Sequence, residues 1–115
     1  MTLQFNYFSE DFATAAQLSP EHLREIAAAG FRSVLGNRPD HEGGPQQPTS
    51  ESLRAAAEAA GLVYAFHPVH PVNITPQDVQ EFSRLLEGLP KPVLAFCRTG
   101  TRSGKLYRAA FGASS

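Results

Sequence analysis

The chain has 115 residues, enough for one domain with a single hydrophobic core. Hydrophobic residues make up 42% and charged residues 18% of it, which is typical of a globular protein, and no apolar run reaches the length of a membrane span. The net charge of −1 provides no basic field, so neither nucleic acid nor a membrane is expected as a partner.

The number of cysteines limits the reactions that this chain can carry out. The chain contains one cysteine, Cys97, which excludes an internal disulfide and any mechanism that needs a second thiol in the same chain. The N-terminus lacks the charged-then-apolar pattern of a signal peptide. We therefore expect a single domain over residues 1–115 in a reducing cytoplasm.

The N-terminal segments predict two short strands and a helix. Leu3–Phe8 alternates apolar and polar residues, which indicates an edge strand or an extended arm, and residues 12–17 indicate a second strand. Ser19 and Pro20 are typical of a helix start, with Ser19 as the N-cap and Pro20 in the first turn. Gly30 is expected to end this helix.

The middle of the chain repeats the pattern of strand and helix. A buried strand is expected over residues 31–35, and a polar loop rich in Gly, Pro and Gln follows over residues 36–48. Thr49 or Ser50 caps a second helix with an alanine-rich face. Residues 62–66 then form the next strand.

A third helix and the last strand come next. Thr75 is the expected N-cap, Pro76 occupies the first helical position, and Asp78 favours the first turn through the helix dipole. Gly88 ends this helix, and residues 92–96 form a short apolar strand.

The alternation of strands and helices predicts an α/β fold. Such a chain forms a three-layer structure, with a mainly parallel central sheet, right-handed crossovers and helices on both faces. Binding sites in these folds lie at the carboxyl ends of the strands. Three polar segments are expected at that edge, namely residues 37–40, 67–70 and 97–102.

The segment around Cys97 is the principal candidate site. It follows a buried strand directly, Gly100 allows a tight turn, and Ser103 is expected to open a final helix that ends near Gly112. Several backbone N–H groups and the positive end of the helix dipole then surround one point and attract an anion. A thiolate at Cys97 is stabilised there and becomes a candidate nucleophile, with Arg102 offering a planar fork of donors to an oxyanion.

Other residues are candidates for supporting roles. No metal or cofactor is expected, because the prolines beside His67 and His70 forbid the helix on which two such histidines bind a metal, and no acid or thiol accompanies them. The candidates for anion binding are Arg98, Thr99, Gly100, Thr101 and Ser103, and the candidates for an acid or accessory role are Arg38, Asp40, His67 and His70.

The motifs resemble one known family. Residues 96–103 (Phe-Cys-Arg-Thr-Gly-Thr-Arg-Ser), with residues 30–40, 60–62 and 74–76, resemble the phosphatase-like domain of beta-lactamase hydrolase-like proteins, a family also catalogued as candidate sulfur transferases. The resemblance implies a protein-tyrosine-phosphatase-like fold, with Cys97 as nucleophile and Arg102 as the anion-binding arginine. Members occur alone, as this chain is expected to be, or joined to a persulfide dioxygenase, which is therefore a possible partner.

The residues leave the reaction open between sulfur transfer and phosphate hydrolysis. Tyrosine-type phosphatases have five residues between Cys and Arg, whereas four separate Cys97 from Arg102, a spacing that resembles single-domain rhodaneses. No carboxylate lies about thirty residues before Cys97, where phosphatases of this fold usually carry their general acid.

The first hypothesis is therefore a sulfurtransferase. It forms a Cys97 persulfide from thiosulfate or a persulfide and passes the sulfur to an acceptor thiol. The alternatives are a phosphatase that acts on a phosphate ester through a Cys97 thiophosphate, and a non-catalytic anion-binding module.

Overall fold

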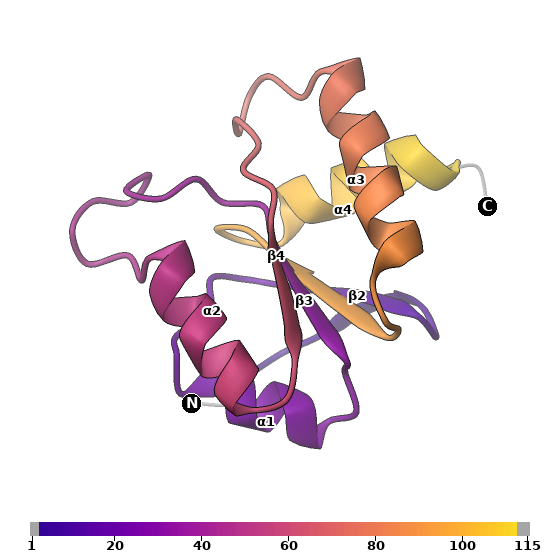
Figure 1. Cartoon of the computed structure of the whole chain (residues 1–115). Helices are drawn as coiled ribbons and strands as arrows, with labels where there is room; N and C mark the ends of the chain where they lie inside the picture. The colour runs from indigo at the N-terminus through magenta and orange to yellow at the C-terminus, as the bar shows by residue number, and fades with distance from the viewer. Residues whose placement is uncertain (1–2, 113–115) are drawn as a thin grey trace.

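The computed structural model describes residues 3–112, which fold around one five-stranded sheet (Figure 1). β1 pairs antiparallel with β2, and all the other neighbouring strands are parallel, which confirms the predicted, mainly parallel sheet. The strands are β1 (Asn6–Ser9), β2 (Phe12–Ala15), β3 (Ser33–Gly36), β4 (Val63–Phe66) and β5 (Val93–Phe96), in the order β1-β2-β5-β3-β4.

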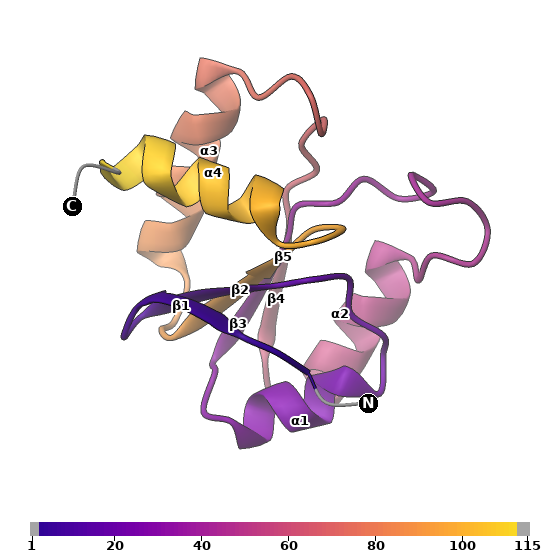
Figure 2. The same ribbon diagram turned by 180° about the vertical axis from the view of Figure 1, so that it is seen from behind.

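The helices cover both faces of the sheet. α1 (His22–Ala28) and α2 (Ser50–Ala59) lie on one face, and α3 (Pro76–Gly88) and α4 (Thr101–Phe111) lie on the other (Figures 1 and 2). The predicted three-layer architecture is therefore confirmed. No helix within residues 3–112 is long and apolar enough to cross a membrane.

The central strand β5 shows how the two cores form. Leu94 and Phe96 pack with the core under α1 and α2, whereas Val93 and Ala95 pack with the core under α3 and α4. Successive side chains of a strand point to opposite faces, so a strand with helices on both sides must be apolar throughout. The four consecutive apolar residues of β5 therefore suit the middle of the sheet. The Cys97 loop follows at the carboxyl end of this strand.

Local capping explains why α2 and α3 begin where the sequence predicts. The Thr49 hydroxyl accepts a hydrogen bond from the Ser52 N–H at 3.1 Å, at the start of α2. At α3, the Thr75 hydroxyl accepts from the Asp78 N–H at 3.1 Å, and the Asp78 carboxylate accepts from the Thr75 N–H at 2.9 Å. This reciprocal pair satisfies two of the N–H groups that a helix leaves unpaired at its start.

The predicted starts of the other two helices are wrong. The N-cap of α1 is Glu21 and not Ser19, because Ser19 takes part in a preceding turn in which its carbonyl accepts from the His22 N–H at 2.9 Å. α4 begins at Thr101, two residues before the predicted Ser103. Gly100 precedes it with φ of 95°, so the chain leaves the Cys97 loop through a conformation that favours glycine and enters the helix directly.

Candidate active site

The Cys97 loop joins β5 to α4 and bends around the cysteine sulfur. The Gly100 N–H donates a hydrogen bond to Cys97 Sγ at 3.1 Å. The positive φ of Gly100 allows this return, which a residue with a Cβ rarely adopts. The segment after β2 anchors the loop from the other side, because the Arg98 carbonyl accepts from the Gln17 N–H at 3.2 Å and the Ala15 carbonyl accepts from the Cys97 N–H at 3.4 Å.

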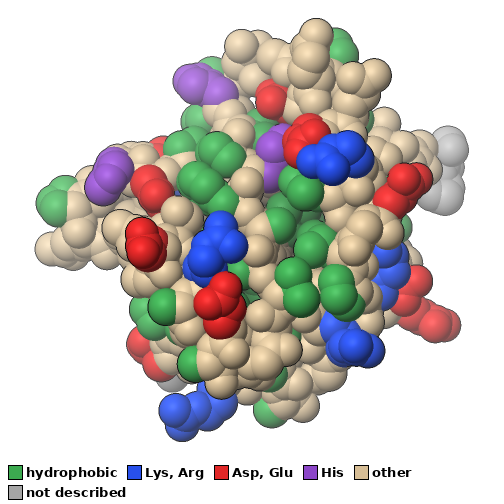
Figure 3. All heavy atoms as spheres, in the orientation of Figure 1, with side chains coloured by type: hydrophobic (Ala, Val, Ile, Leu, Met, Phe, Trp, Pro, Cys, Tyr) green, Lys and Arg blue, Asp and Glu red, His purple; other side chains and the backbone are tan. Residues whose placement is uncertain are grey.

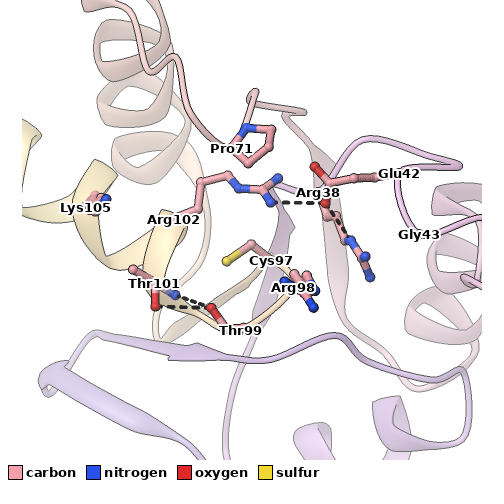
Figure 4. Close-up of a pocket in the computed structure, with 10 residues that line it drawn as sticks. All are labelled: Arg38, Glu42, Gly43, Pro71, Cys97, Arg98, Thr99, Thr101, Arg102 and Lys105. Carbon is pink, nitrogen blue, oxygen red and sulfur yellow. Dashed lines mark hydrogen bonds and ion pairs between the residues drawn. The ribbon is translucent and has the colours of Figure 1, made fainter.

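The sulfur lies at the bottom of an open pocket. Cys97 is only 1% exposed, but it lines a cavity of ≈ 540 Å³ whose other walls are mostly polar. The cavity therefore gives a small ligand a path to a sulfur that the rest of the chain covers. The lining residues are Arg38, Glu42, Gly43, Pro71, Cys97, Arg98, Thr99, Thr101, Arg102 and Lys105 (Figure 4).

Arg102 is held in place by the two loops that follow β3 and β4. It is 7% exposed, and its Nη1 donates to the Val69 carbonyl at 3.0 Å and to the Asn37 carbonyl at 3.4 Å. Its Nη2 donates to Glu42 Oε1 at 3.1 Å. Its Nε is buried and has no hydrogen-bond partner within residues 3–112. Because a buried donor without a partner is costly, this N–H marks a position where an oxyanion in the pocket would be stabilised.

Glu42 is a pocket residue that the sequence did not reveal. Its Oε1 accepts from Arg38 Nε at 2.7 Å as well as from Arg102, so two guanidinium groups share one carboxylate (Figure 4). Burial alone would raise the pKa of Glu42, but hydrogen bonds and charges of Arg102 and Arg38 outweigh it and lower the pKa. The carboxylate is therefore ionised at neutral pH and is a poor proton donor.

A buried polar network supports the pocket from behind. The Ser103 hydroxyl donates to Asn37 Oδ1 at 2.9 Å, and Asn37 Nδ2 donates to the His67 carbonyl at 2.9 Å. Ser103 is fully buried, so it ties α4 to the carboxyl ends of β3 and β4 and does not line the pocket as an anion-binding residue. The carboxyl edge of the sheet therefore brings the segments after β3, β4 and β5 together, as the topology predicted. Asn37 links them through its hydrogen bonds to Ser103 and His67.

The environment of His67 predicts a pH-dependent stability. Burial lowers the pKa of His67 below 6.5, against smaller opposing effects of Asp78 and Glu81. Its Nδ1 lies 3.4 Å from Asn37 Nδ2, a donor, so a proton on Nδ1 would be repelled. A histidine with a lowered pKa in the folded state is protonated first in the unfolded chain, so the free energy of unfolding falls as the pH drops through 6.5.

Urea denaturation between about pH 7 and pH 5 measures this effect. The free energy of unfolding is expected to fall over that range, and to fall less in His67→Gln. His70→Gln is the matched control, because His70 is exposed. The Glu42 carboxylate loses its stabilising effect only below the ordinary glutamate pKa of 4.5, so it does not contribute to this range. An equal pH dependence in His67→Gln and the unaltered protein would contradict the assignment.

The remaining candidates fall into two groups. Arg38, Arg98, Thr99 and Thr101 all line the pocket, and the Thr99 hydroxyl donates to Thr101 Oγ1 at 3.1 Å. The structure does not bring Asp40, His67 or His70 into its lining.

Each of the absent side chains has another partner. The Asp40 carboxylate accepts from the Ser50 N–H at 2.7 Å and from the Ser50 hydroxyl at 2.9 Å, so it stabilises the start of α2. His70 Nδ1 accepts from the Val72 N–H at 3.2 Å, on an exposed loop. No group of three or more His, Cys, Asp or Glu side chains that could hold a metal occurs in the described part of the chain.

The fold and the loop together define a cysteine-based, phosphatase-like protein. The sequence profile of the phosphatase-like domain of beta-lactamase hydrolase-like proteins matches residues 4–113. The chain belongs to this family, which confirms the resemblance seen in the sequence.

Individual relatives agree with this assignment. A beta-lactamase hydrolase-like protein of Xylella fastidiosa (strain Temecula1 / ATCC 700964) is 38% identical over 99 residues, which is 86% of this chain and 23% of the relative. The chain therefore spans about a quarter of the length of the curated relatives that it matches.

Solved structures share the fold. A candidate phosphatase from Neisseria meningitidis has a TM-score of 0.84 and 34% identity, covering 93% of this chain and 78% of that one. P. aeruginosa TpbA in complex with pTyr has a TM-score of 0.68 and 18% identity, covering 90% of this chain and 61% of that one. The second likeness concerns the fold alone.

Proposed function

We propose that the chain hydrolyses small phosphate esters, with Cys97 as the nucleophile. The observation that carries the proposal is the position of Cys97 Sγ. It lies at the bottom of a cationic pocket, accepts the Gly100 N–H at 3.1 Å, and shares the pocket with the buried Arg102. A thiolate is the reactive form of cysteine, and a backbone N–H beside the start of a helix favours negative charge on the sulfur.

The reaction proceeds in two displacements. Cys97 Sγ attacks phosphorus, a P–S bond forms, and the P–O bond to the leaving group breaks. The loop N–H groups and Arg102 Nε, which has no partner in the described chain, stabilise the phosphoryl oxygens. Water then attacks phosphorus, the P–S bond breaks, and inorganic phosphate leaves with the thiolate restored.

The carboxylates in and near the pocket are poorly suited to protonate a leaving group. Glu42 is the only carboxylate among the described residues that line it, and two arginines lower its pKa, while Asp40 is bound to Ser50. A general acid protonates the leaving oxygen in most phosphate-ester hydrolysis. We therefore expect aryl and acyl phosphates, whose leaving groups are stable as anions, to react faster than alkyl phosphates.

Sulfur transfer remains a second candidate, because two observations favour it. Only four residues separate Cys97 from Arg102, and no pocket carboxylate in residues 3–112 is suited to donate a proton. In this reaction Cys97 Sγ attacks the outer sulfur of thiosulfate, an S–S bond forms, and sulfite leaves without needing a proton. An acceptor thiolate then attacks the outer sulfur of the persulfide and restores Cys97.

One pair of measurements separates the two reactions. The protein is incubated with p-nitrophenyl phosphate while released phosphate is measured, and separately with thiosulfate or glutathione persulfide before intact-mass spectrometry. Phosphate release without a stable sulfur adduct supports hydrolysis. A mass gain of one sulfur atom on Cys97, without phosphate release, supports sulfur transfer and contradicts the proposal. If neither occurs, a non-catalytic anion-binding module is the better description.

A further inference from the structure

The pocket above Cys97 is larger than a phosphoryl group requires. Its volume is ≈ 540 Å³, within the range of about 300–1,000 Å³ that holds whole organic ligands. The part of the substrate that does not react therefore also contacts the pocket. The side chains around that space indicate what this part is.

The lining side chains are mostly charged, and the positive ones predominate. Four basic residues face one acidic residue, Glu42, and Pro71 contributes an apolar ring at the rim (Figure 4). No aromatic side chain within residues 3–112 lines the cavity. The concentration of positive charge is local, because the whole chain has a net charge of −1 and acidic and basic side chains are interspersed on the face shown in Figure 3.

Two of these cations have side-chain partners, and the other two have none among the residues that the structure describes. Arg38 and Arg102 share the Glu42 carboxylate, and Arg38 also donates to Gln17 Oε1 at 3.2 Å. Within residues 3–112, the exposed side chains of Arg98 and Lys105 form neither a hydrogen bond nor an ion pair. In Figure 4 they lie on either side of Cys97, Arg98 from the loop and Lys105 from α4.

We propose that the substrate is a small aliphatic acyl phosphate with a second anionic group, which Arg98 and Lys105 attract while the reacting phosphoryl group binds beside Cys97. This inference rests on the proposed phosphatase function. The loop N–H groups, the start of α4 and Arg102 serve the reacting group, so Arg98 and Lys105 remain for a second charge. An aromatic ring such as that of phosphotyrosine finds no aromatic side chain against which to stack.

Phosphonates that cannot be hydrolysed test the inference by binding alone. The Cys97→Ser protein is titrated by isothermal calorimetry with methylphosphonate, phenylphosphonate and propane-1,3-diphosphonate. The diphosphonate is expected to bind about fivefold or more tightly than methylphosphonate, since an exposed ion pair contributes modestly and two cations are available. Phenylphosphonate is expected to bind no more tightly than methylphosphonate.

Variants that remove one positive charge show which side chains make the diphosphonate bind more tightly than methylphosphonate. Arg98→Gln and Lys105→Gln are each expected to reduce the advantage of the diphosphonate, and the double variant to abolish it. Arg24→Gln, which removes an exposed cation outside this pocket, is the matched control and should leave the advantage intact. Rising salt should weaken the advantage, because exposed ion pairs are screened.

Other outcomes overturn the inference. Equal binding of methylphosphonate and the diphosphonate, tighter binding of phenylphosphonate, or an equal loss in Arg24→Gln would each contradict a second anionic subsite. In these cases methylphosphonate still binds, so the phosphoryl pocket of the proposed function stands. If no phosphonate binds at all, the proposed phosphatase function fails together with the subsite.

Discussion

Cys97→Ser is expected to lower phosphate release from p-nitrophenyl phosphate by at least about 10³-fold, because removal of a catalytic nucleophile typically has effects of this order or larger. A serine hydroxyl fits the space of the thiol and can still accept the Gly100 N–H, which donates to Sγ at 3.1 Å. A serine hydroxyl, however, is a much weaker nucleophile than a cysteine thiolate. The loss should therefore appear in turnover and not in folding.

Initial rates and a thermal unfolding midpoint, measured on the same preparation, check this expectation. Arg24→Gln is the control, since Arg24 lies outside the Cys97 pocket and its variant should retain full activity. A folded Cys97→Ser protein that keeps more than a tenth of the activity would mean that Cys97 is not the nucleophile.

Phe12→Ala is expected to destabilise the protein by about 3–5 kcal/mol, the usual cost of removing a buried aromatic side chain. Phe12 is 1% exposed, and its ring stacks on Tyr107 with centroids 4.3 Å apart and meets Phe82 edge-on at 5.9 Å. It therefore joins β2 to both α3 and α4. Because small domains have a free energy of unfolding of about 5–15 kcal/mol, this loss could remove much of the stability.

Urea denaturation of the two proteins measures the difference. Phe111→Ala is the matched control, because Phe111 also contacts Tyr107 but is 45% exposed, and it should cost less than about 1 kcal/mol. Equal losses in the two variants would show that the stacked arrangement of Phe12 does not contribute as the structure indicates.

Local signals in the sequence were sufficient for most of the fold. The caps at Thr49 and Thr75 each involve a residue three positions away, so the chain carries them in a contiguous stretch. The helix after Ser19 was misplaced because Ser and Pro suit a turn as well as a cap, and the turn formed here. The Cys97 loop was also recognisable, because all of its residues are adjacent in the chain.

Side-chain partners between distant loops were not predictable. Arg38 and Asp40 lie two residues apart, yet Arg38 lines the pocket while Asp40 binds Ser50 at the start of α2. Glu42 gave no signal in a loop rich in Gly and Pro, although it bridges Arg38 and Arg102. Contacts of this kind depend on how the loops after β3, β4 and β5 approach each other.

The sequence by itself determined the alternation of strands and helices, the carboxyl-edge location of the site, and the Cys97–Arg102 loop, because periodicity, capping and loop spacing act over a few neighbouring residues. Only the tertiary structure decided that Glu42 bridges two arginines, that Ser103 supports the loop from behind, and that Arg98 and Lys105 remain unpaired within residues 3–112. These outcomes depend on burial and on charges brought together across the sheet, and neither has a signature along the chain.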